Sequence, residues 1–211
     1  MMKSLLSILI LIWPLILKGQ NDPEAIKVLD NFSATALSAP SVSLKFKLIS
    51  IDQVNGTKDT IDGALLMAKD KYKLELPDNI VWFNGSVSWS YLIAEKEVTI
   101  TRPDKKDDSF MSRPSSIFTL YKKGYKARLV QDNTTSYIID LYPEDLKSEL
   151  VRIRLIITKK TSSLSAAEYK RKDGTSVFLA VDDFDLSKKP DAGLFTFDNK
   201  QYSGVDVIDM R

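Results

Sequence analysis

Apolar residues recur at every second position along most of the chain after residue 41. Val42, Leu44 and Phe46 alternate with Ser43 and Lys45, and later segments repeat this spacing. Successive side chains of a β-strand point to opposite faces, whereas an amphipathic α-helix has apolar residues three and four positions apart. The alternation therefore predicts strands that bury one face and leave the other face in water.

Dipeptides typical of tight turns separate several of these segments. Asn-Gly stands at residues 55–56 and 84–85, and Asp-Gly stands at residues 173–174. Both dipeptides favour two-residue hairpin turns, in which φ is positive. The turns and the alternating segments together predict an antiparallel sheet of about ten strands. The expected strands cover residues 42–48, 61–69, 72–76, 80–83, 86–93, 98–101, 125–130, 136–142, 151–158, 164–171 and 175–184, with short terminal strands at 195–197 and 205–208.

The segment before the first strand carries helical signals instead. Asp22 can cap a helix that starts at Pro23. Val28, Leu29 and Phe32 then follow at helical spacing. We therefore predict a helix whose apolar stripe lies against the sheet.

A second, short helix is predicted at residues 114–121, where the strands are interrupted. It presents Ile117, Phe118 and Leu120 within one or two turns and ends before Gly124. A helix this short is marginal alone and must be held by packing of its apolar face. This property makes the segment a candidate for a movable lid.

The expected fold follows from these elements. A large antiparallel sheet must curl in order to cover its apolar face. The predicted class is mainly β (α+β), a curled antiparallel sheet or half-open β-barrel with the N-terminal helix and the short central helix as its lid. Such a shape leaves an apolar concavity. A chain of 211 residues suffices for one domain, which we expect to span residues 20–211.

Residues 1–19 have the pattern of a secretory signal peptide. Lys3 gives a positive start, residues 5–17 are almost entirely apolar, and Gly19 and the polar Gln20 follow. The apolar run is shorter than the ~20 residues that a helix needs to cross a bilayer. Cleavage beside Gly19 or Gln20 and release into the periplasm are therefore predicted in preference to an uncleaved anchor.

The composition excludes several kinds of chemistry. The chain has no cysteine and no histidine, which rules out thiol nucleophiles, Cys/His zinc sites and Ser-His-Asp triads. Removal of Lys3 and Lys18 with the signal lowers the number of basic residues from 30 to 28, which equals the number of acidic residues, 28. A balanced charge is a poor footprint for nucleic acid, so no nucleic-acid partner is expected.

Carboxylates remain as candidates for catalysis or metal binding. They are Asp182, Asp183, Asp185 and the pair at residues 144–145. The plainer interpretation is a strand end and a turn, because these acids are too close in sequence to flank a substrate. The prediction is a protein that is not an enzyme, with no catalytic residue, no metal site and no cofactor.

Three stretches of the sequence, in their order and spacing, resemble a known family. They are Gly-Ala-Leu-Leu-Met-Ala-Lys at residues 63–69, Asn-Gly-Ser-Val-Ser-Trp-Ser-Tyr at 84–91, and the end of the chain, with Phe-Thr-Phe at 195–197 and Gly-Val-Asp-Val-Ile-Asp at 204–209. Asp-Gly-Thr at 173–175 also fits. The mature chain is similar to the periplasmic outer-membrane lipoprotein carrier protein family, LolA. The family's Arg-Pro pair after the glycine-led strand is absent, and Lys69-Asp70 stands nearby.

The resemblance implies a carrier, or chaperone, that binds the acyl chains of lipoproteins in an apolar cavity and ferries them toward the outer membrane. The expected partners are acylated lipoproteins or other lipid cargo, an inner-membrane release transporter and an outer-membrane acceptor, and the carrier itself is expected to be a monomer. The alternative on the same fold is a protein that senses lipid or lipoprotein, or that binds another hydrophobic ligand.

Large apolar side chains on the predicted strands are candidates for the cavity wall, although each could belong to an ordinary packed core. The wall candidates are Phe46, Leu65, Met67, Tyr72, Leu74, Trp82, Trp89, Tyr91, Ile153, Leu155 and Phe178. The lid candidates are Val28, Leu29, Phe32, Ile117, Phe118 and Leu120.

Overall fold

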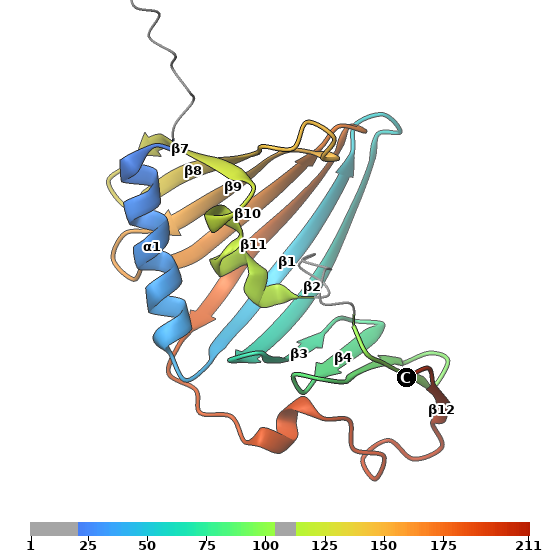
Figure 1. Cartoon of the computed structure of the whole chain (residues 1–211). Coiled ribbons are helices and arrows are strands. Elements are labelled where there is room, and N and C mark those ends of the chain that lie inside the picture. Colours follow the sequence, from blue (N-terminus) through green and yellow to red (C-terminus); the bar gives the residue numbers. More distant parts are fainter. Residues whose placement is uncertain (1–20, 104–112) are drawn as a thin grey trace, which may run out of the picture.

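The computed structural model describes residues 21–103 and 113–211, so the predicted signal at residues 1–19 lies outside the described residues. One long, curled sheet forms the body of the protein (Figure 1). The strands are β1 (Val42–Asp52), β2 (Thr57–Ala68), β3 (Lys71–Glu75), β4 (Asn79–Phe83), β5 (Ser88–Leu92), β6 (Glu97–Thr101), β7 (Tyr125–Asp132), β8 (Ser136–Pro143), β9 (Leu150–Thr158), β10 (Ser163–Arg171), β11 (Thr175–Asp185) and β12 (Asp206–Asp209). The helical elements are α1 (Pro23–Ser38) and the 3₁₀ segments η1 (Pro114–Phe118), η2 (Leu120–Lys122) and η3 (Ala192–Phe195).

The sheet is not closed into a barrel. Its strand order is β12-β6-β5-β4-β3-β2-β1-β11-β10-β9-β8-β7, so β12 and β7 form two separate edges. Within the described residues the sheet has 12 strands, slightly more than the ten or so expected, and the short strand expected at residues 205–208 is present as β12. Within β1–β6 and within β7–β11, strands adjacent in the chain pair as antiparallel hairpins. β1 pairs with β11 antiparallel, and β12 pairs with β6 in parallel.

The three predicted hairpin turns are confirmed. They join β1 to β2, β4 to β5 and β10 to β11. Gly56, Gly85 and Gly174 adopt φ values of +67°, +95° and +89°, which residues with a Cβ atom rarely adopt. The turn dipeptides therefore set where these strand pairs begin.

Gly63 is required for a different reason, the close approach of a side chain. It lies directly opposite Phe46 in the β1–β2 register. A Cβ atom on Gly63 would stand 2.5 Å from Cζ of Phe46, whose ring is fully buried and has little room to move. The glycine that leads this strand motif thus provides the space that the Phe46 ring fills.

The predicted N-terminal helix is confirmed, and its first turn is bonded to the sheet. Oδ1 of Asp22 accepts hydrogen bonds from the backbone N–H groups of Glu24, at 3.0 Å, and Ala25, at 3.4 Å. Its Oδ2 accepts from the N–H of Leu129 on β7 at 3.1 Å. The Leu129 bond is the main cause of a pKa for Asp22 below the ordinary value. One carboxylate therefore caps α1 and anchors it to the sheet edge.

The predicted central helix is instead two consecutive 3₁₀ segments, η1 and η2. Their backbone bonds run from residue i+3 to residue i, as from Thr119 N–H to Ser116 O at 2.9 Å and from Lys122 N–H to Thr119 O at 3.0 Å. A run of so few residues gains little from α-helical bonds, and tight 3₁₀ turns are common at this length. The apolar packing expected for it is present, since Ile117 and Phe118 are buried.

α1, η1 and η2 lie together on the concave face of the sheet, and we call these three elements the helical cover (Figure 1). The rings of Phe32 and Phe118 lie 5.2 Å apart and join α1 to η1. The hydroxyl of Tyr121 donates to Oδ1 of Asp30 at 2.5 Å and joins η2 to α1. The main hydrophobic core lies between this cover and the sheet.

The last part of the chain runs from β11 to the far edge of the sheet, where β12 pairs with β6 (Figure 1). On the way, Phe197 and Tyr202 pack on Trp82 and Tyr91 with ring centroids 5.0–6.4 Å apart. The strand expected at residues 195–197 is therefore not formed, and η3 with an extended segment takes its place.

The outer face of β8–β10 carries a partly buried ion network. Nε and Nη2 of Arg154 donate to the two carboxylate oxygens of Asp140 at 2.7 and 2.8 Å. Arg152 bonds to Glu168 on the neighbouring strand. Burial alone would raise the pKa of Asp140, but the bonds from Arg154 outweigh it and hold the pKa below its ordinary value.

Candidate ligand-binding pocket

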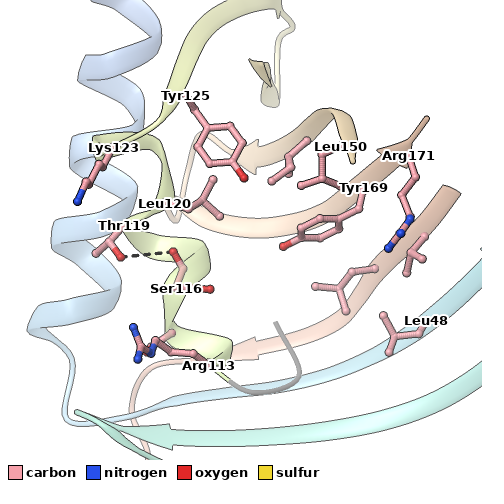
Figure 2. A pocket seen from close by; sticks show the side chains of 14 residues that line it. Leu48, Arg113, Ser116, Thr119, Leu120, Lys123, Tyr125, Leu150, Tyr169 and Arg171 are labelled. Atoms are coloured by element: carbon pink, nitrogen blue, oxygen red, sulfur yellow. Dashed lines mark hydrogen bonds between the residues drawn. The ribbon is translucent and has the colours of Figure 1, made fainter. Parts of the chain in front are cut away.

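An apolar pocket of about 870 Å³ opens on the concave face, between the 3₁₀ segments and the middle of the sheet (Figure 2). Its walls come from β1, β7, β9, β10 and β11 on one side and from η1, η2 and their flanking residues on the other. The lining residues are Leu48, Arg113, Ser115, Ser116, Thr119, Leu120, Lys123, Tyr125, Leu150, Ile153, Tyr169, Arg171, Val177 and Leu179.

The pocket exists because the helical cover ends before the strands do. Along the concave face of β10, Ala167 is buried, Tyr169 is partly buried and Arg171 is exposed. On the neighbouring β11, Leu179 is buried and Val177 is partly buried. The wall thus runs without a break from the packed core to the open end near the hairpin turns. A long apolar ligand can lie along this wall, with one end near the core and the other end in water.

Tyr169 brings a hydroxyl group into this apolar wall. Figure 2 shows its ring reaching into the pocket from β10. Among the described residues its hydroxyl has no hydrogen-bond partner. Burial raises its pKa above the ordinary value, so the group stays a neutral donor at physiological pH. A ligand in the pocket can supply the missing partner.

The helical cover contains all six predicted lid residues. Leu29, Phe32, Ile117 and Phe118 are buried against the core, and Val28 is partly buried beside them. Leu120 alone among the lid candidates lines the pocket. The structure therefore brings these side chains together in one layer.

The hydrogen bond between Tyr121 and Asp30 holds this layer together. Burial and this bond raise the pKa of Tyr121 to about 12. The hydroxyl therefore remains a donor at any physiological pH, and α1 and η2 stay linked.

The predicted wall residues fall into three places. Ile153 lines the pocket. Six others lie deeper, in the core between the sheet and the cover: Phe46, Leu65, Met67, Tyr72, Leu74 and Leu155. These six face the concave side but are covered in this conformation.

Four predicted wall residues lie on the outer face instead. Tyr72 pairs with Phe83 across β3 and β4, and Trp82 pairs with Lys73, so Tyr72 and Trp82 point to opposite faces. Trp82, Trp89 and Tyr91 belong to the aromatic cluster under the C-terminal segment. Phe178 alternates with Val177 and Leu179, which line the pocket, and it therefore points outward.

Sequence reasoning missed most of the pocket lining. Leu48 ends an alternating run that was recognised, and Tyr169 and Arg171 share a face of a predicted strand. The spacing of these residues predicts that they share a face of the sheet with their neighbours. Only the position of the helical cover shows which part of that face is left uncovered as a pocket. The residues not predicted are Arg113, Ser115, Ser116, Thr119, Lys123, Tyr125, Leu150, Tyr169, Arg171, Val177, Leu179 and Leu48.

Three of the acidic candidates have structural partners. Asp182 lies 3.5 Å from Nζ of Lys47, and Asp185 accepts a hydrogen bond from the backbone of Ser187 at 2.8 Å. Asp145 accepts from the N–H of Lys147 at 2.8 Å in a turn. Over residues 21–103 and 113–211 there is no group of three or more acidic side chains arranged to hold a metal ion. No helix in the same part of the chain has the length and apolar character needed to cross a membrane.

An open, curled antiparallel sheet with a helical layer on its concave face and an apolar pocket beside that layer defines a class of folds suited to holding hydrophobic ligands. The family model for the outer membrane lipoprotein carrier protein LolA matches residues 17–175. The chain therefore belongs to the LolA family. The Phe-Thr-Phe and Gly-Val-Asp-Val-Ile-Asp stretches lie beyond the matched residues.

Comparison with solved structures gives matches at low sequence identity. An uncharacterized conserved protein from Thermus thermophilus aligns with a TM-score of 0.59 and 10% identity, over 88% of this chain and 99% of that chain, and shares the fold. A LolA superfamily protein from Nitrosomonas europaea gives a TM-score of 0.43 and 12% identity, over 82% and 97%. The lipoprotein LppX of Mycobacterium tuberculosis gives 0.45 and 12%, over 81% and 100%. A search of curated proteins gave no sequence match.

Proposed function

We propose that this protein is a periplasmic carrier that binds the acyl chains of lipoproteins in its pocket and ferries them toward the outer membrane. Residues 1–19 act as the export signal, and residues 20–211 form a single carrier domain. Membership of the LolA family supports the proposal. An inner-membrane transporter that loads the carrier and an outer-membrane acceptor are the partners expected by resemblance to that family. The carrier acts as a monomer and needs no catalytic group.

The observation that carries the proposal is the continuous apolar wall of the concave face, whose side chains change from buried to more exposed along β10 and β11. The pocket of about 870 Å³ is within the range of roughly 300–1,000 Å³ that is usual for small-molecule sites. Each CH₂ group that leaves water is stabilised by ~0.8 kcal/mol, so an acyl chain on this wall gains many times the thermal energy. A pocket of this kind needs no reacting groups to be useful.

Movement of the helical cover would give the carrier room for more than one acyl chain. Beneath η1 lies a core whose concave-face side chains include Phe46, Leu65 and Met67. Displacement of η1 and η2 would join this region to the pocket. Cargo would then push the two segments away from the sheet, and delivery would let them return. The short length of each segment favours such movement, because neither is stable without its packing.

The proposal is tested with purified protein and a neutral fluorescent probe, N-phenyl-1-naphthylamine. The probe should bind, and a diacylated peptide should displace it. Leu48 lines the pocket and Ile49, its neighbour on β1, points to the outer face, so Leu48→Gln and Ile49→Gln form a matched pair. Leu48→Gln should weaken binding of the peptide several-fold and Ile49→Gln should not. Failure of the wild-type protein to bind probe and peptide would refute the proposal.

A further inference from the structure

Among the described residues, the charged side chains that line the pocket are all basic. Arg113, Lys123 and Arg171 belong to its lining, and no aspartate or glutamate does so among the described residues. This contrasts with the mature chain as a whole, in which basic and acidic residues balance. An apolar cavity with a cationic rim fits a ligand that is apolar at one end and anionic at the other.

Arg171 stands at the open end of the apolar wall. Its Nε donates to Oδ2 of Asp173 at 3.2 Å, and the structure gives its terminal amino groups no other partner among the described residues. Tyr169 lies two positions earlier on β10, on the same face. Arg171 can therefore bind a second anion, while the Tyr169 hydroxyl points into the pocket on the side away from Arg171 (Figure 2).

Lys123 belongs to the opposite wall, on the far side of the pocket from Arg171 (Figure 2). It follows η2 directly, its side chain is exposed, and it makes no ion pair within the described part of the chain. The pocket thus has one cation on the sheet side and one on the cover side. Both are exposed to water and neither lies in the core, where an unpaired charge would be costly.

We infer that the cargo of this pocket carries an anionic group, a carboxylate or a phosphate, directly beside its acyl chain, and that Arg171 holds this group at the mouth. The acyl chain lies deeper, along Val177 and Leu179. The inference rests on the proposed function and specifies the chemistry of the cargo. It also gives the polar head a fixed position, so that a bound cargo is oriented with its head toward the hairpin ends of β10 and β11.

The test compares single-chain amphiphiles with the same twelve-carbon tail. Dodecanoate, dodecyl phosphate, dodecanol and dodecylammonium compete with the neutral probe N-phenyl-1-naphthylamine below their micelle-forming concentrations. At low ionic strength the two anions should displace the probe at concentrations about fivefold lower than dodecanol, and dodecylammonium should be the weakest, as expected for exposed ion pairs. The preference should shrink as salt is added. Comparison of dodecanoate with dodecyl phosphate distinguishes a carboxylate from a phosphate head.

Charge-removing variants locate the effect. Arg171→Gln should reduce the preference for the anions over dodecanol. Lys123→Gln, on the opposite wall, should reduce this preference less. Lys170→Gln is the matched control, because Lys170 neighbours Arg171 on β10 but points to the outer face. This control should keep the full preference.

Equal displacement by dodecanoate and dodecanol would overturn the inference and leave the proposed apolar site standing. Loss of the preference in Lys170→Gln to the same extent as in Arg171→Gln would also overturn it, because the effect would then come from overall charge. Absence of displacement by all four amphiphiles would refute the proposed function and the inference together.

Discussion

Replacement of Phe118 by alanine tests whether the helical cover acts as a lid. Phe118 is fully buried, and its ring packs 5.2 Å from that of Phe32. Truncation of a buried phenylalanine to alanine costs about 3–5 kcal/mol. The free energy that holds η1 against the sheet would fall by this amount. A loss of ~3 kcal/mol corresponds to roughly a hundredfold shift toward the displaced cover, since each 1.4 kcal/mol is a factor of ten.

The expected result is a carrier that holds acyl cargo longer. The empty closed state loses stability while the loaded open state does not, so cargo dissociation and transfer to acceptor vesicles should both slow. Stopped-flow transfer of a fluorescent diacylated peptide measures the rate. Amide hydrogen exchange of residues 116–123 measures the opening directly, because their backbone bonds should exchange faster in the variant.

Phe195→Ala is the matched control. Phe195 is as fully buried as Phe118, but it lies in the C-terminal segment, outside the core that the cover encloses. Its truncation should lower the free energy of unfolding by a similar amount without changing transfer. Equal transfer rates for the two folded variants would refute the lid reasoning and make η1 a fixed part of the wall.

Three further predictions concern the sheet. Gly63→Ala should destabilise the fold by about 1–3 kcal/mol in urea titrations, because the new Cβ overlaps the Phe46 ring; Gly63→Ala combined with Phe46→Leu should recover part of the loss. Asp140→Asn should cost about 3–5 kcal/mol at pH 7, since it leaves Arg154 without its carboxylate partner. The folded pKa of Asp140 is depressed, so its stabilisation is present above the unfolded value of ~3.9 and is lost as the pH falls below it; thermal melts of wild type and variant should therefore converge in acid, and a constant difference would contradict this origin. Trp82→Ala should lower the melting temperature without weakening probe binding, because Trp82 lies on the outer face.

Local features of the fold could be predicted from the sequence because short-range chemistry determines them. Asp22 caps α1, and the Asn-Gly and Asp-Gly pairs form hairpin turns where they were expected. Each of these outcomes depends on residues within a few positions of one another. The central helix was predicted in the right place but with the wrong geometry, since pattern alone does not separate a short α-helix from consecutive 3₁₀ turns.

The pocket could not be predicted in the same way, because it depends on contacts between distant residues. Alternation gave the shared face of Trp89 and Tyr91 correctly, but not whether that face is concave or outer. That choice follows from the β3–β4 register and from the C-terminal segment that covers the aromatic side chains. Likewise, Tyr169 is open to the pocket only because the cover ends above Ala167. Neither the outward direction of Trp89 and Tyr91 nor the exposure of Tyr169 to the pocket can be inferred from the sequence of the strand that carries the residue.

The strand order has a consequence for how the chain assembles as it is made. Strands β1–β6 and β7–β11 form two series of successive hairpins, and each series can form as soon as its own residues are available. The two series join through β1 and β11, and β6 gains its outer neighbour only when residues 206–209 have been made. Until then a half-finished sheet has open edges on which other chains can pair. Once β12 is in place, this edge of the sheet is a strand of four residues that begins and ends with aspartate, and short, charged edge strands are poor templates for pairing. A chain cut short after β11 should therefore be more prone to self-association even though its pocket-forming strands are complete.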